Sequence, residues 1–201
     1  SHAVAQHRIS GLTFEIAVFS NISRDHLDYH KTFNEYINAK KAFFDHLDES
    51  SVALVNIDDK HGKTMVQNTK ASVHTYGIRT LADFKGRVIE NSFDGLHLQI
   101  ENKDVFTQLI GSFNAYNIMA VYGVSSILGI EEITALSAIT TLKSVNGRFD
   151  FNISKNKIIT IVDYAHTPDA LENVLSTISD IREGNEVLYT VVGCGGDRDT
   201  G

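Results

Sequence analysis

The stretch from residue 32 to residue 47 constrains the fold most, because its apolar residues repeat with the period of an α-helix. Thr32 and Glu35 have the spacing of a capping box, in which the two side chains satisfy free backbone N–H groups at a helix start. The apolar residues of the stretch fall within one arc of the helix surface: Phe33, Tyr36, Ile37, Phe43, Phe44 and Leu47. The sequence therefore predicts an amphipathic helix with one face packed on a core.

Lys40 lies in the middle of this apolar arc. Lysine is rarely buried unless it is paired, and burial lowers its pKa. Taken alone, the residue is best interpreted as a lysine whose stem packs while its ammonium group reaches water. The run Asp25-His26-Leu27-Asp28 just upstream favours a chemical role, because a neutral amine near histidine and carboxylates can serve as a base or a nucleophile. It can also become a carbamate that helps to bind a metal ion.

Apolar runs separated by polar turns predict an α/β fold with a mostly parallel sheet. Buried strands are expected at residues 15–19 and 52–57, and a continuous apolar run predicts an interior parallel strand at 157–162. Residues 72–109 alternate between apolar and polar and predict further strands, partly antiparallel, at the rim of the sheet. Further elements are expected as helices at 111–128, 131–142 and 168–182 and a strand at 187–192. Ligands of such sheets bind beyond the carboxyl ends of the strands, which is where residues 21–30 lie.

Charge and cysteine usage exclude several classes of protein. The net charge of −7, from 18 basic and 25 acidic side chains, argues against a nucleic-acid partner, which calls for a basic surface. A single cysteine excludes an intrachain disulfide framework and fits a reducing compartment. No apolar run is long enough to span a membrane, and no signal peptide opens the chain. We therefore expect a soluble cytoplasmic protein that does not bind membranes.

Three further groups of residues suggest nucleotide chemistry or imitate it. Asn114 and Asn117 are expected on the inward face of the first turn of a helix, where an amide can pair with the edge of an adenine ring; helix capping is the alternative for Asn114. Asp163 follows a predicted strand, a position from which a carboxylate can accept hydrogen bonds from ribose hydroxyls. Gly62-Lys63-Thr64 imitates the end of a phosphate-binding P-loop, but the glycine required five residues earlier is replaced by Ile57, so we reject that interpretation.

Six motifs occur in an order that resembles the Mur ligases of peptidoglycan synthesis, and among them the MurE type. They are SRDHLDYH, YINAK, SFNAYN, VNGRFD, VDYAHTPDALENVL and GCGGDRD, and they extend over nearly the whole chain. The resemblance implies that residues 1–147 form most of the central ATP-binding domain, of P-loop type but without its N-terminal P-loop part. It implies that residues 148–201 begin a Rossmann-like C-terminal domain.

The resemblance also assigns roles to individual residues. His26 and a carbamylated Lys40 are implied as catalytic residues that bind Mg²⁺, since a carbamate offers the oxygen ligands that this ion prefers. The residues implied for nucleotide binding are Asn114, Asn117, Arg148, Asp163 and His166. Gln6 and Arg8 are implied to contact the UDP-sugar and Arg198 the incoming amino acid; without the resemblance, Gln6 and Arg8 would be ordinary exposed polar residues. Asp150 departs from the family, which usually has glutamate there.

The implied reaction is an ATP-dependent ligation through an acyl phosphate. It adds meso-diaminopimelate or L-lysine to UDP-MurNAc-L-Ala-D-Glu, and the sequence leaves the choice of diamino acid open. We expect a monomer, and we expect this fragment alone to be inactive. Two alternatives remain: a related ligase such as folylpolyglutamate or cyanophycin synthetase, which lacks the SRDHLDYH and GCGGDRD pair, and a non-catalytic chain that binds a UDP-sugar or a partner surface.

Overall fold

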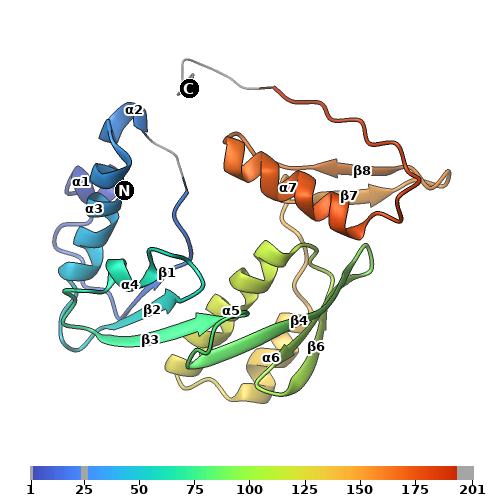
Figure 1. Ribbon diagram of the computed structural model, residues 1–201. Helices are drawn as coiled ribbons and strands as arrows, with labels where there is room; N and C mark the ends of the chain where they lie inside the picture. Colours follow the sequence, from blue (N-terminus) through green and yellow to red (C-terminus); the bar gives the residue numbers. More distant parts are fainter. Residues whose placement is uncertain (1, 24–26, 194–201) are drawn as a thin grey trace.

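A six-stranded sheet organises the first two thirds of the chain (Figure 1). The computed structural model describes residues 2–23 and 27–193, with the backbone alone for 27 and 28. The strands follow one another across the sheet in chain order: β1 (Ile16–Phe19), β2 (Val52–Asn56), β3 (Ser72–Gly77), β4 (Phe84–Ser92), β5 (Gly95–Ile100) and β6 (Lys103–Thr107). Neighbours from β1 to β4 are parallel, and those from β4 to β6 are antiparallel. The α/β fold and the antiparallel rim predicted from the sequence are confirmed.

Helices cover both faces of this sheet. The described helices are α1 (His2–Ala5), α2 (Leu27–His30), α3 (Phe33–Asp45), α4 (Gly62–Met65), α5 (Ser112–Ile127), α6 (Glu132–Thr140) and α7 (Pro168–Ile181). Of these, α7 lies on the hairpin described below and not on this sheet. Successive side chains of β2 point to opposite faces. Accordingly Ala53 and Val55 pack in the core under α3, whereas Leu54 packs in the core under α5. Within the described ranges, no helix is long and apolar enough to cross a membrane.

The amphipathic helix predicted around Lys40 is confirmed as α3. Thr32 is its N-cap, and the Thr32 hydroxyl accepts a hydrogen bond from the backbone N–H of Glu35 (3.2 Å). Tyr36, Ile37 and Phe44 are buried against β1 and β2. The apolar period therefore fixes both the helix and the face that it buries.

The last part of the chain forms a hairpin covered by α7. The hairpin strands are β7 (Asp150–Ile153) and β8 (Ile159–Val162), and they pair antiparallel. Phe149 and Ile178 are buried here together with Ile110, which precedes α5. This small core joins the hairpin unit to the start of α5 (Figure 1).

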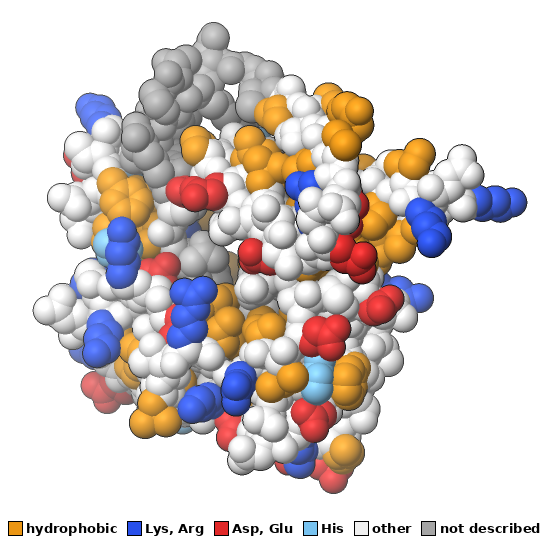
Figure 2. Space-filling model, turned by 45° about the vertical axis from the view of Figure 1, so that its right-hand side comes forward, with side chains coloured by type: hydrophobic (Ala, Val, Ile, Leu, Met, Phe, Trp, Pro, Cys, Tyr) orange, Lys and Arg blue, Asp and Glu red, His pale blue; other side chains and the backbone are white. Residues whose placement is uncertain are grey.

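Two predictions for this part of the chain are wrong. The run at 157–162 is not an interior parallel strand: Lys157 has a φ of 61° in the turn, β8 pairs antiparallel, and Val162 is 60% exposed. Residues 187–192 lie in no strand in the part of the chain that the structure describes, and Tyr189 and Val191 are exposed. The reason is that a β-rich run becomes a strand only when a neighbour accepts its backbone hydrogen bonds. Figure 2 shows apolar side chains at the surface in this part of the molecule.

Candidate functional site

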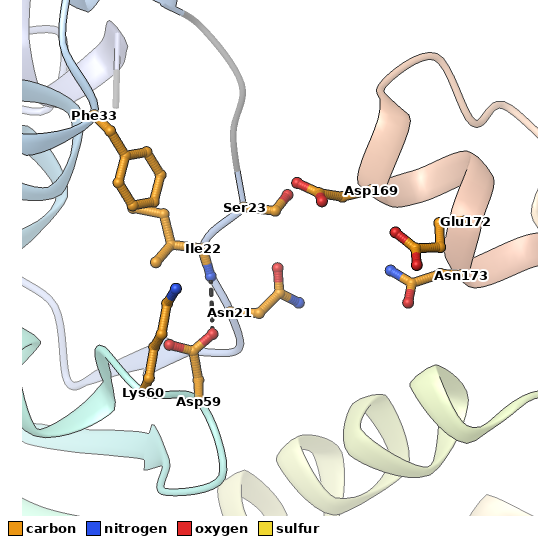
Figure 3. Close-up of a pocket in the computed structure, with 9 residues that line it drawn as sticks. All are labelled: Asn21, Ile22, Ser23, Phe33, Asp59, Lys60, Asp169, Glu172 and Asn173. Carbon is orange, nitrogen blue, oxygen red and sulfur yellow. Dashed lines mark hydrogen bonds between the residues drawn. The ribbon is translucent and has the colours of Figure 1, made fainter. Parts of the chain in front are cut away.

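A cleft of about 640 Å³ lies between the carboxyl ends of the first strands and the first turns of α7 (Figure 3). Parallel strands place their carboxyl ends at one edge of a sheet, so the loops after β1 and β2 meet there. The loop after β1 contributes Asn21, Ile22 and Ser23, the loop after β2 contributes Asp59 and Lys60, α3 contributes Phe33, and α7 contributes Asp169, Glu172 and Asn173. The lining includes three carboxylates and one ammonium group, a composition suited to a ligand with both signs of charge.

Asp59 fastens the loops on one side of this cleft to each other. Its Oδ2 accepts a hydrogen bond from the backbone N–H of Ile22 (3.2 Å), drawn as a dashed line in Figure 3. Its Oδ1 accepts one from the backbone N–H of His61 (2.8 Å). The His61 ring packs edge-on against Phe33 of α3, with the ring centroids 5.6 Å apart. The wall of the cleft is thus held by a carboxylate and by an aromatic contact.

Asp58, the residue before it, accepts hydrogen bonds on the other side of the β2 loop. Its Oδ2 accepts from the backbone N–H groups of Ile78 (2.8 Å) and Arg79 (2.9 Å), and its Oδ1 accepts from that of Thr80 (2.8 Å). The Tyr116 hydroxyl of α5 also donates to Oδ2 (3.1 Å). Burial raises the pKa of Asp58, but the hydrogen bonds from Thr80, Ile78 and Arg79 outweigh it, so the pKa lies below its usual value.

The two asparagines predicted for adenine recognition lie on α5, next to Tyr116. The Asn114 side-chain amide donates to the backbone carbonyl of Ile110 (2.7 Å), and the N-cap position belongs to Gly111, so Asn114 is not a capping residue. The Asn117 amide donates to Asn114 Oδ1 (3.1 Å). Asn114 is half-buried, but Asn117 is exposed, so the prediction that both face inward is wrong for Asn117.

The structure brings together three other predicted residues at the linker and the end of β8. Asp163 Oδ2 accepts from the backbone N–H of Phe149, and Oδ1 accepts from that of Ala165, each at 2.7 Å. The Arg148 guanidinium lies 5.4 Å from the centroid of the Tyr164 ring, and His166 Nδ1 donates to the Tyr164 carbonyl (2.9 Å). Arg148 and His166 are exposed and accessible to a ligand.

Packing connects this linker group to the asparagines. The rings of Phe113 and Phe149 lie 6.0 Å apart, and each is next in sequence to a predicted nucleotide residue, Asn114 and Arg148 respectively. The two groups therefore approach each other through an aromatic contact between their neighbours. Among the described residues, no hydrogen bond joins them directly.

Lys40 is half-buried on α3, as its place in the apolar arc predicts. Its ammonium nitrogen lies 5.2 Å from the centroid of the buried Tyr36 ring, a cation–π distance. In the described parts of the chain, no group of three His, Cys, Asp or Glu residues could hold a metal ion. His26, the other predicted metal ligand, lies outside the described residues, so the magnesium site stays a prediction.

The predicted substrate residues stand apart from the cleft or outside the described chain. Gln6 and Arg8 are exposed just after α1. Arg198 lies outside the described residues. The cleft residues Asp59 and Lys60 were not singled out from the sequence, although two aspartates directly after a buried strand were a usable signal.

Both parts of the chain match domains of one family. Residues 1–125 match the Mur ligase middle domain, and residues 147–201 match the glutamate ligase domain of Mur ligases. The chain is 55% identical over 201 residues to UDP-N-acetylmuramoyl-L-alanyl-D-glutamate--2,6-diaminopimelate ligase from Phocaeicola vulgatus, and this covers 100% of the chain and 42% of the relative. It is 52% identical over 199 residues to the ligase of the same name from Cytophaga hutchinsonii, covering 99% of the chain and 41% of the relative. A solved structure with that name is 34% identical, covers 98% of this chain and 42% of its own, and superposes with a TM-score of 0.74.

Proposed function

The chain belongs to the Mur ligase family, and we propose that it is part of an ATP-dependent ligase that adds a diamino acid to UDP-MurNAc-L-Ala-D-Glu. The observation that carries the proposal is the match along the full chain to ligases named for that substrate. The chain spans about two fifths of their length, 41% and 42%, so the activity belongs to the longer protein. Their names favour 2,6-diaminopimelate over lysine as the amino acid.

We further propose two units with a boundary between residues 147 and 148. Residues 1–147 contain the six-stranded sheet, and residues 148–201 contain the hairpin and α7. The division is supported by the pairing of β7 and β8 with each other in a sheet of their own, apart from the six-stranded sheet. A linker between two units allows the closing movement that brings two substrates together.

The nucleotide is proposed to bind near the linker, against Asn114, Asn117, Arg148, Asp163 and His166. The exposed Arg148 guanidinium can offset the charge of the phosphates, which is the main requirement of phosphoryl transfer. Asp163 is held rigidly by two backbone N–H groups, and each of its oxygens keeps a lone pair for a ribose hydroxyl. His166 is oriented through Nδ1, which leaves Nε2 for the ligand.

Magnesium is proposed to bind to His26 and to the carbamate form of Lys40. When bound, the ion would neutralise charge on the phosphates. The half-buried position of Lys40 on the apolar side of α3 supports this proposal. Within the described residues, no group of three His, Cys, Asp or Glu side chains adds further ligands to these two.

The proposed reaction has two steps. The free D-glutamyl carboxylate attacks the terminal phosphate of ATP, which forms an acyl phosphate and releases ADP. The amine of the diamino acid then attacks the acyl carbon, the amide bond forms, and inorganic phosphate leaves with loss of the ammonium proton. In this scheme Gln6 and Arg8 hold the UDP-sugar, and Arg198 binds the diamino acid.

The test is ATP turnover by the intact protein with UDP-MurNAc-L-Ala-D-Glu and each diamino acid in turn. We expect phosphate release that depends on both substrates and is faster with meso-diaminopimelate than with lysine. The proposal would be overturned if phosphate release did not depend on either diamino acid, or if it required glutamate instead. Product mass supplies a second readout, because a true ligase joins the amino acid to the nucleotide sugar.

A further inference from the structure

The two adjacent aspartates after β2, Asp58 and Asp59, have no role in the function proposed above, although they lie at the carboxyl edge of the sheet. Their carboxylates turn to opposite sides of the loop. Asp58 accepts hydrogen bonds from the loop after β3 and from α5, whereas Asp59 accepts from the loop after β1 and from the start of α4. One dipeptide therefore links several segments that are distant in sequence.

The Asp58 side of this junction reaches the proposed nucleotide site. Its partner on α5, Tyr116, lies between Asn114 and Asn117 in the sequence. Burial and the nearby Asp58 carboxylate raise the pKa of Tyr116 to about 12, so the hydroxyl remains a hydrogen-bond donor. The space for the carboxylate depends on Gly77, since a Cβ at that position would lie 3.0 Å from Asp58 Oδ2. The start of α5 is thus tied to the sheet by one directed hydrogen bond.

The Asp59 side reaches the cleft. The hydrogen bond from Ile22 fixes the backbone of the loop after β1, whose residues Asn21, Ile22 and Ser23 line the cleft. This loop leads directly to residue 26, the proposed metal ligand. Displacement of Ile22 therefore shifts the cleft wall.

We propose that Asp58 and Asp59 are positioning residues for the ligase reaction, Asp58 for the nucleotide site and Asp59 for the cleft. Asp58 acts through Tyr116 on the nucleotide residues of α5. Asp59 acts through Ile22 on the loop whose residues form one wall of the cleft. The proposal rests on the proposed function, and it distinguishes the two neighbouring carboxylates by what they hold.

The first test compares Tyr116→Phe with Tyr122→Phe in the intact protein. Both variants remove one hydroxyl from α5, but the Tyr122 hydroxyl donates to Glu132 (3.4 Å), away from the proposed site. We expect Tyr116→Phe to raise the KM for ATP by roughly 3- to 10-fold and to leave the KM for the diamino acid unchanged. Tyr122→Phe should leave both constants unchanged. Because Asp58 acts through Tyr116, the effect of Asp58→Asn on the KM for ATP should not add to that of Tyr116→Phe.

The second test compares Asp59→Asn with Asp83→Asn. Asp83 also accepts two hydrogen bonds, from the backbone N–H and the hydroxyl of Thr75 (2.8 Å each), but it lies outside the cleft lining. In Asp59→Asn, the new side-chain amide can accept from only one of Ile22 and His61, and its NH₂ group opposes the other donor. We expect kcat to fall about tenfold in Asp59→Asn with the KM for ATP nearly unchanged, and no change in Asp83→Asn.

The proposal is overturned if each variant has the same kcat and KM values as its control. It is also overturned if kcat and both KM values worsen together in the test variants and their thermal stability falls. The proposed function fails separately, if the wild-type protein shows no ATP turnover that depends on the diamino acid. In that case calorimetric binding of ADP decides the Asp58 half: unchanged ADP affinity in Tyr116→Phe overturns it, and weaker binding supports it. For the Asp59 half, amide hydrogen exchange decides in that case: faster exchange of the Ile22 N–H in Asp59→Asn than in wild type supports it, and unchanged exchange overturns it.

Discussion

Replacement of Gly62 by alanine tests whether this glycine serves packing or phosphate binding. Gly62 begins α4 and is buried against β2. An added Cβ would lie 2.3 Å from the backbone oxygen of Asn56 and 3.1 Å from Val55 Cγ1. Asn56 cannot retreat easily, because its side-chain amide donates to the Ser20 carbonyl (2.8 Å) and its Oδ1 accepts from the backbone N–H of Asp58 (3.0 Å). The helix α4 must therefore move away from the strand.

The expected magnitude follows from two opposing terms. Overpacking against backbone costs about 3 kcal/mol at the upper end of the usual range. The greater helix propensity of alanine recovers about 1 kcal/mol. The free energy of unfolding should thus fall by about 2 kcal/mol, seen as a lower urea midpoint with an unchanged slope when unfolding is followed by tyrosine fluorescence.

Lys63→Ala is the matched control, because Lys63 lies in the same turn with an exposed side chain. Its loss should change the free energy of unfolding by less than about 0.5 kcal/mol and should leave ATP affinity unchanged. A Gly62→Ala variant of wild-type stability, together with loss of ATP binding in Lys63→Ala, would refute this reasoning. Gly62-Lys63-Thr64 would then be a phosphate cradle after all.

Three further outcomes are expected. The stabilising effect of Asp58 is measured as the difference in urea midpoint between wild type and Asp58→Asn. It should be constant at neutral pH and should shrink as the pH falls below the ordinary pKa of 3.8, because the pKa in the folded state is lower still. A difference that grows on acidification contradicts the hydrogen-bond assignment. Lys40→Ala should lower the ligase activity of the intact protein more than about 100-fold, and added short carboxylic acids should restore part of that activity. Failure of this rescue, together with no carbon-13 carbamate signal in wild type after labelling with bicarbonate, would argue against the carbamate. Thr167→Ala should reduce the free energy of unfolding by about 1 kcal/mol, since the Thr167 hydroxyl accepts from the backbone N–H of Ala170 (3.3 Å) at the start of α7; an unchanged urea midpoint would mean that the cap contributes nothing.

Local patterns predicted the elements that depend on near neighbours in the chain. The helix α3 follows from its apolar period and from the Thr32 cap, and the helix predicted at residues 168–182 corresponds to α7. The predicted strands at residues 15–19 and 52–57 correspond to β1 and β2. The same logic failed at 157–162, because an apolar run does not specify the direction of its partner, and the turn at Lys157 returns the chain antiparallel.

For the candidate site too, the sequence indicated some of the residues, and only the structure showed how others contact one another. The order of the motifs alone indicated the family and pointed to Lys40, Arg148, Asp163 and His166, since each stands in a recognisable local pattern. Only the tertiary structure decided that Asp58 accepts from Tyr116 and that Asp59 accepts from Ile22, contacts that join residues 58 and 37 positions apart. Residues so distant in sequence carry no local period or spacing, and parallel strands bring them together only when the sheet has formed.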